Sequence, residues 1–104
     1  MNGFRCALVG EGLLLVQCGD VLLAQGHHVD VVATAHPQVL AWARSNGIAP
    51  VPFERLGQAL EDNPVDWLFS IVNLRLLPAE ILRKTGKGAI NFHDALLPGQ
   101  AGLN

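Results

Sequence analysis

The sequence predicts a doubly wound α/β fold, in which a mostly parallel sheet carries helices on both faces. Short apolar runs that end in turn residues alternate along the chain with longer segments of helical periodicity. The runs are nearly continuous in apolar residues, as expected for strands that are covered on both sides. Alternating strands and helices imply parallel strands joined by right-handed crossovers, and 104 residues suit one domain.

Four runs rich in apolar and β-branched residues are the expected strands, at residues 4–9, 29–33, 67–72 and 89–92. A further run at 48–53 contains Pro50 and Pro52. Because proline has no N–H to donate, this run can form only a short or edge strand.

The helices are expected between these strands. Residues 13–25 have apolar side chains spaced by three and four, and Gly26 is a suitable stop. Pro37 fits the first turn of a second helix, which Asn46 and Gly47 end. Shorter helices are expected at 54–60 and 78–84.

The composition excludes several classes of protein. Half of the residues are hydrophobic and only 15% are charged, whereas disordered segments are polar and highly charged. The seven Lys and Arg residues form no basic patch, which argues against a nucleic-acid partner. No apolar run approaches the roughly 20 residues that span a bilayer, and no secretory signal pattern is present.

The cysteines and histidines favour structural roles. Cys6 and Cys18 are too few for a disulfide framework, and we interpret them as buried free thiols rather than as a bridge or metal site, in a cytoplasmic protein. His27 and His28 are adjacent and would point to opposite faces of a strand. We interpret them and His36 as exposed loop residues, and we expect no metal site.

The loops after the first, fourth and fifth runs are candidate sites, because ligands in such sheets bind beyond the carboxyl ends of the strands. The first loop begins as a dinucleotide fingerprint, Gly10-Glu11-Gly12, but Leu15 stands where the third glycine belongs. Glu11 also places a negative charge where a helix N-terminus would favour phosphate. A tight turn is therefore favoured over a nucleotide site.

The last run ends in Asn91 and His93, which lie two apart and so project from one face. An amide beside an imidazole can stabilise an oxyanion while a proton is moved. A polar strand end with a satisfied histidine explains this spacing equally well.

Two motifs together resemble the active-site signature of the folate-dependent formyltransferases, which include methionyl-tRNA, glycinamide ribonucleotide and sugar N-formyltransferases. The first motif is Asn-Phe-His-Asp-Ala-Leu-Leu-Pro at 91–98, and the second is Asn-Leu-Arg-Leu-Leu-Pro at 73–78, in the place of the family's pterin loop. The resemblance covers nearly the whole chain and implies an incomplete formyltransferase fold with a Rossmann-like sheet.

The resemblance also implies roles for individual residues, with formyl-tetrahydrofolate as the formyl donor. Asn91 would bind the formyl oxygen, and His93 would assist proton transfer as an amine attacks. The residues that would hold or shape the pterin pocket are Arg75, Leu76, Leu77, Leu97 and Pro98. Ordinary loop packing is the alternative for the leucines and the proline, and a solvated cation is the alternative for the arginine.

Two departures from the family's pattern indicate which part of a formyltransferase this sequence is expected to form. Ala95 replaces a serine, and the sequence ends at Asn104, before the place of the family's catalytic aspartate. We therefore expect residues 1–104 to be the N-terminal, folate-pocket domain of a formyltransferase, truncated after the Asn-x-His loop and inactive as a free chain. The edge at 89–104 should expose apolar surface and favour self-association.

The sequence says less about the chemical identity of the formyl acceptor. Glu11 argues against a phosphorylated acceptor, and both ends of the sequence resemble formyltransferase-like domains at the N-terminus of nonribosomal peptide or hybrid synthetases. The acceptor amine there would belong to an aminoacyl group on a carrier protein. A non-catalytic docking module of a synthetase is the alternative, and a nucleotide-binding Rossmann-like protein is a weaker one.

Overall fold

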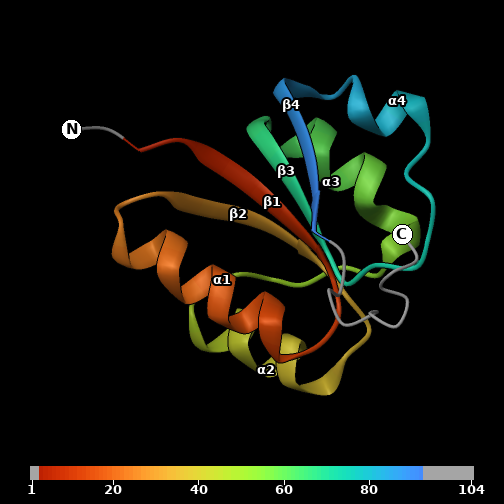
Figure 1. Cartoon of the computed structure of the whole chain (residues 1–104). Helices are drawn as coiled ribbons and strands as arrows, with labels where there is room; N and C mark the ends of the chain where they lie inside the picture. The colour runs from red at the N-terminus through yellow and green to blue at the C-terminus, as the bar shows by residue number, and fades with distance from the viewer. Residues whose placement is uncertain (1–2, 93–104) are drawn as a thin grey trace, which may run out of the picture.

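A parallel four-stranded sheet with the order β2-β1-β3-β4 forms the centre of the fold. The computed structural model describes residues 3–92 (Figure 1). The strands are β1 (Arg5–Gly10), β2 (His28–Ala33), β3 (Val65–Ile71) and β4 (Thr85–Phe92). The helices are α1 (Leu13–Ala24), α2 (Pro37–Ser45), α3 (Leu56–Asp62) and α4 (Ala79–Leu82), with a 3₁₀ turn, η1 (Phe53–Arg55). The predicted parallel α/β fold is confirmed.

Helices cover both faces of the sheet, with α1 and α2 on one side and α3 and α4 on the other (Figure 1). The central strand β1 shows why its sequence is apolar throughout. Cys6 and Leu8 are buried in the cluster under α1 and α2, whereas Ala7 and Val9 are buried in the cluster under α3. Successive strand residues point to opposite faces, so a strand covered twice needs apolar residues at every position.

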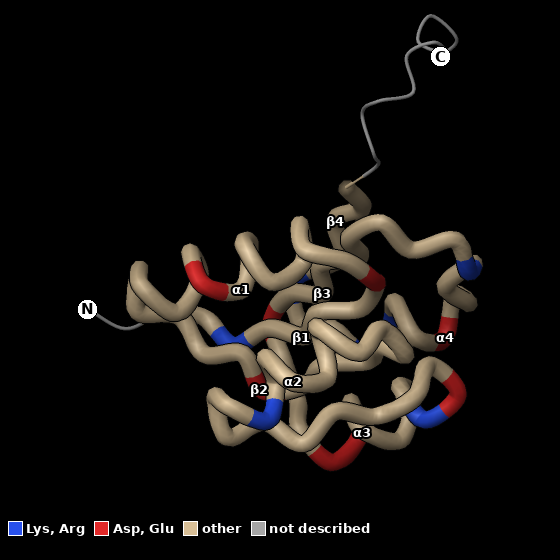
Figure 2. The backbone as a smooth tube through the Cα atoms, turned by 90° about the horizontal axis from the view of Figure 1, so that it is seen from below, with Lys and Arg blue, Asp and Glu red and all other residues tan. Residues whose placement is uncertain are grey.

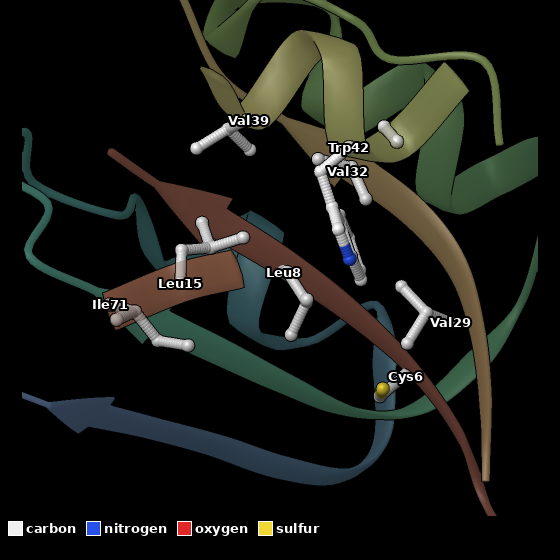
Figure 3. Packing of buried hydrophobic residues seen from close by; sticks show 9 residues of the cluster. Cys6, Leu8, Leu15, Val29, Val32, Val39, Trp42 and Ile71 are labelled. Carbon is white, nitrogen blue, oxygen red and sulfur yellow. The ribbon is translucent and has the colours of Figure 1, made fainter. Parts of the chain in front are cut away.

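Trp42 fixes the contact between α1 and α2. Its ring lies among the buried side chains of the α1–α2 face (Figure 3), and its Nε1 donates a hydrogen bond to Oδ1 of Asp20 at 2.8 Å. Gly19 lies directly against the ring, because a Cβ at this position would be 2.3 Å from Trp42 Cη2. A glycine inside α1 thus admits the indole between the two helices.

The run at 48–53 forms no strand of the sheet, only an isolated bridge between Ala33 and Val51. Val51 donates to the carbonyl of Val32 at 2.9 Å and accepts from the amide of Thr34 at 3.0 Å. The prolines on either side of it have no N–H, so the ladder cannot extend. In contrast, β4 is longer than predicted and begins at Thr85 rather than at residue 89.

The three histidines expected on exposed loops all differ from that prediction, although His28, the first residue of β2, is exposed. His27 is half-buried, stacks on Phe4 with ring centroids 3.7 Å apart, and accepts a hydrogen bond from the Phe4 amide at 3.1 Å through Nδ1. His36 is the N-cap of α2, and its Nδ1 accepts from the amide of Gln38 at 3.2 Å. Among the described residues, no helix is both long and apolar enough to cross a bilayer.

Candidate functional site

The loops that the sequence marks as candidate sites all begin at the carboxyl ends of the strands, on the same side of the sheet. The strands are parallel, and the register pairs Gly10 with Ile71 and Ile71 with Phe92, so the carboxyl ends of β1, β3 and β4 are level. The close approach of β1 and β3 requires Gly10, whose φ is 145° and whose Cβ would lie 1.8 Å from the Ile71 carbonyl oxygen. The first loop is thereby held against the end of β3.

The loop after β3 has a defined and strained backbone. Val72 has a φ of 51°, which is rare for a β-branched residue and costs on the order of 1–3 kcal/mol. Its amide donates to the Phe92 carbonyl at 3.2 Å. Asn73 then holds the loop: its Nδ2 donates to Ser70 Oγ at 3.1 Å and to the Arg75 carbonyl at 2.9 Å, and its Oδ1 accepts from the Arg75 amide at 3.2 Å.

A pocket of about 250 Å³ lies between this loop and the end of β4. Its lining comprises Ser70, Arg75, Leu76, Leu77, Leu82, Ala89, Ile90 and Asn91. Asn91 pairs in register with Ser70, so both side chains leave the sheet on its α3–α4 side. We call this cavity the β3–β4 pocket.

The β3–β4 pocket brings together four residues that the sequence proposed for the site: Arg75, Leu76, Leu77 and Asn91. The other three, His93, Leu97 and Pro98, lie outside the described residues. Sequence reasoning did not single out Ser70, which is buried, or Asn73. An asparagine just after a strand is a typical turn former, and that signal was available.

Arg75 is a paired cation. Its Nη1 donates to Oε2 of Glu54 at 2.7 Å, and its guanidinium carbon lies 4.9 Å from the centroid of the Phe53 ring. The hydrogen bond from Arg75 holds the pKa of Glu54 below its usual range. Since both side chains are more than half exposed, the pair orients the loop more than it stabilises the fold.

Two further cavities adjoin this edge. One, of about 250 Å³, lies at the carboxyl ends of β1, β2 and β3 and is lined by Glu11, Thr34, Glu54 and Arg75 among others. The other is an apolar groove of about 310 Å³ between α1 and the edge of the sheet, lined by Gln17, Cys18, Val21, Leu22, Phe69, Ile71 and Phe92. The described residues contain no group of three His, Cys, Asp or Glu side chains that could hold a metal ion.

No protein-family model and no curated protein matches the sequence. The solved structures that resemble the fold include two formyltransferases. Glycinamide ribonucleotide transformylase 1 from Symbiobacterium toebii matches with a TM-score of 0.70 and 20% identity, over 92% of this chain and 54% of that one. Phosphoribosylglycinamide formyltransferase from Anaplasma phagocytophilum matches with a TM-score of 0.68 and 19% identity, over 93% of this chain and 52% of that one. The chain thus spans about half the length of each and has, over that span, the fold of these formyltransferases.

Proposed function

We propose that this chain is the folate-pocket part of a formyltransferase-like domain, which transfers a formyl group from formyl-tetrahydrofolate to an amine. The observation that carries the proposal is the β3–β4 pocket: two sequence motifs that resemble the formyltransferase signature contribute to one cavity at the carboxyl ends of two parallel strands. Ligands in this class of sheet bind at that edge. The likeness to two formyltransferase structures supplies the fold that this assignment requires.

The lining of the β3–β4 pocket suits a flat heteroaromatic ring. Leu76, Leu77 and Leu82 give it apolar walls, while Asn91 adds an amide. Its volume of about 250 Å³ is below the range of roughly 300–1,000 Å³ that holds drug-sized ligands. The pocket therefore fits the pterin ring of a folate better than the whole molecule.

The chemistry would be divided between two side chains. The bound folate supplies the formyl carbon. Asn91, at the end of β4, would donate a hydrogen bond from its amide to the formyl oxygen, where negative charge develops during attack. His93, two residues further, would accept a proton from the attacking amine. In such a transfer the acceptor nitrogen would gain a bond to the formyl carbon, the donor's bond to that carbon would break, and the proton taken from the amine would pass to the donor nitrogen.

The acceptor that we propose is an amine carried by a synthetase carrier protein, on the strength of the sequence resemblance. Glu11 lines the cavity at the ends of β1–β3 and places a carboxylate where a phosphorylated acceptor would need cations. A cytoplasmic setting agrees with this class of reaction. If the pocket binds no folate, the non-catalytic docking role takes the place of this proposal.

Calorimetric titration with a reduced folate, NAD and ATP tests the proposal. We expect the folate to bind and the two nucleotides not to bind. Leu76→Ser should weaken folate binding roughly three- to tenfold, because an apolar wall of the pocket is lost. Leu76 is 90% exposed, so the substitution should leave the fold intact.

Leu74→Ser is the matched control, because Leu74 is 99% exposed and does not line the β3–β4 pocket. It should leave folate affinity unchanged. Equal losses in the two variants, or binding of NAD in place of the folate, would contradict the assignment of the pocket.

A further inference from the structure

The cavity at the carboxyl ends of β1, β2 and β3 has no role in the folate site described above. We call it the β1–β3 cavity. It adjoins the β3–β4 pocket, because Arg75 lines both. Loop residues 73–75 face the β1–β3 cavity, and residues 75–77 face the β3–β4 pocket. A molecule in one cavity would therefore lie across a single loop from a molecule in the other.

The charges that line the β1–β3 cavity do not balance. Its charged side chains are Glu11, Glu54 and Arg75. Arg75 and Glu54 neutralise each other through their 2.7 Å contact. Among residues 3–92, the donors to the Glu11 carboxylate are neutral: Thr34 Oγ1 at 3.3 Å and the Ala35 amide at 3.5 Å. The ion pairs between described residues are made by the carboxylates of Asp30, Glu54 and Glu61. The carboxylate of Glu11 therefore has no cationic partner among the described residues.

The carboxylate of Glu11 is also held in a fixed position. It is half-buried, and its amide donates to the Ile71 carbonyl at 3.3 Å, which ties the backbone to the end of β3. The Thr34 hydroxyl and the Ala35 amide orient the carboxylate from the end of β2. A carboxylate that is fixed in a cavity before its partner arrives costs little ordering entropy when a cation binds.

We infer that the β1–β3 cavity binds a cationic group of the acceptor, an ammonium or guanidinium, with Glu11 as its counter-ion. This inference rests on the proposed function, since the shared wall with the folate pocket is what makes the occupant the acceptor. The cationic group is a second, non-reacting one, because the attacking amine must be uncharged. A phosphate in the same cavity would face two carboxylates, and the single guanidinium there is already bound to Glu54.

Two small probes of similar size separate the possibilities. 1,3-Diaminopropane and O-phosphoethanolamine both carry a primary amine, but the far group is an ammonium in one and a phosphate in the other. Titration of the isotope-labelled chain, followed by ¹H–¹⁵N NMR, should show saturable shifts at the amides of Glu11, Ala35 and Asn73 with the diamine. We expect the phosphate probe to bind at least tenfold more weakly.

Glu11→Gln tests the assigned residue. It keeps one oxygen, which can still accept from the Thr34 hydroxyl, and it removes the charge at the cost of the 3.5 Å contact with the Ala35 amide. The fold should therefore persist, and diamine affinity should fall roughly tenfold or more. Glu80→Gln, at an exposed carboxylate on α4 outside the cavity, is the control and should change nothing. Tighter binding of the phosphate probe, or unchanged diamine affinity in Glu11→Gln, overturns the inference.

A folate titration of the same samples keeps the two proposals distinct. Folate shifts at Leu76, Leu77 and Asn91 without diamine shifts at Glu11 would overturn this inference and leave the proposed function standing. Diamine binding without folate binding would instead overturn the proposed function, and with it the identification of the cavity's ligand as an acceptor.

Discussion

At the scale of single residues, the two thiols show how much the surroundings change one side chain. Cys6 is fully buried in β1, and this burial, assisted by the negative charge of Asp30, raises its pKa to about 12. Cys18 is half-buried on α1 and lines the apolar groove, and burial raises its pKa as well. The prediction of free thiols is confirmed for both, but full burial holds only for Cys6.

We predict that iodoacetamide at pH 8 alkylates Cys18 before Cys6. The thiolate is the reactive form, and a thiol with a pKa of about 12 remains protonated at pH 8. Cys6 is also inaccessible in the folded chain. Mass spectrometry of digested samples measures both rates. In a Cys18→Ser variant, Cys6 should be alkylated no faster than the chain unfolds globally. Rapid alkylation of Cys6 in this variant would contradict its burial.

At the scale of elements, the contact between α1 and α2 depends on a residue that has no side chain. Alanine normally stabilises a helix by up to about 1 kcal/mol relative to glycine. At Gly19 we predict the opposite, because a Cβ would lie 2.3 and 2.4 Å from two ring carbons of the buried Trp42. Gly19→Ala should lower the free energy of unfolding by roughly 1–3 kcal/mol, the range for overpacked cores.

Urea unfolding followed by tryptophan fluorescence measures this loss. Gln17→Ala, at an exposed position of the same helix, is the control and should be neutral or slightly stabilising. A Gly19→Ala variant as stable as the parent would mean that the indole moves aside without cost.

At the scale of the whole molecule, charged side chains are few, and α1 carries fewer than a surface helix usually does. The Lys and Arg residues are scattered instead of gathered on one face (Figure 2), and Asp20 is the single charged residue of α1. Among the exposed apolar side chains, Val21 on α1 and Ile90 and Phe92 on β4 lie at or beside the apolar groove. β4 is also one of the two edge strands of the described sheet. Unpaired strand edges beside apolar surface favour association.

We predict that the chain self-associates through β4 and the groove, with a second copy as the partner. Val21→Lys, at a residue that is 60% exposed, should shift the population toward monomer without loss of stability. Leu74→Lys, at an equally apolar residue that is 99% exposed and does not line the groove, should have no such effect. Sedimentation velocity over a range of concentrations measures both; a monomeric parent chain at high concentration would exclude this surface as a self-association site.

The sequence by itself determined the order of strands and helices and the covering of both sheet faces. These features follow from local periodicity, turn residues and continuous apolar runs, which are properties of neighbouring residues. It also indicated where β1 ends, because the turn residues Gly10-Glu11-Gly12 follow its apolar run.

The tertiary structure decided which residues meet. The pairing of Ser70 with Asn91 places the end of β4 beside residues 75–77, and the bonds of Glu11 to Thr34 and of Arg75 to Glu54 join residues more than twenty positions apart. Such contacts depend on which strands become neighbours in the sheet, and the periodicity of adjacent residues does not specify that order. Thus Asn91, Arg75, Leu76 and Leu77 could be named from motifs, and Asn73 could be found as a turn former after a strand. The contact of Glu54 with Arg75 required the folded chain, because only folding brings these two residues together.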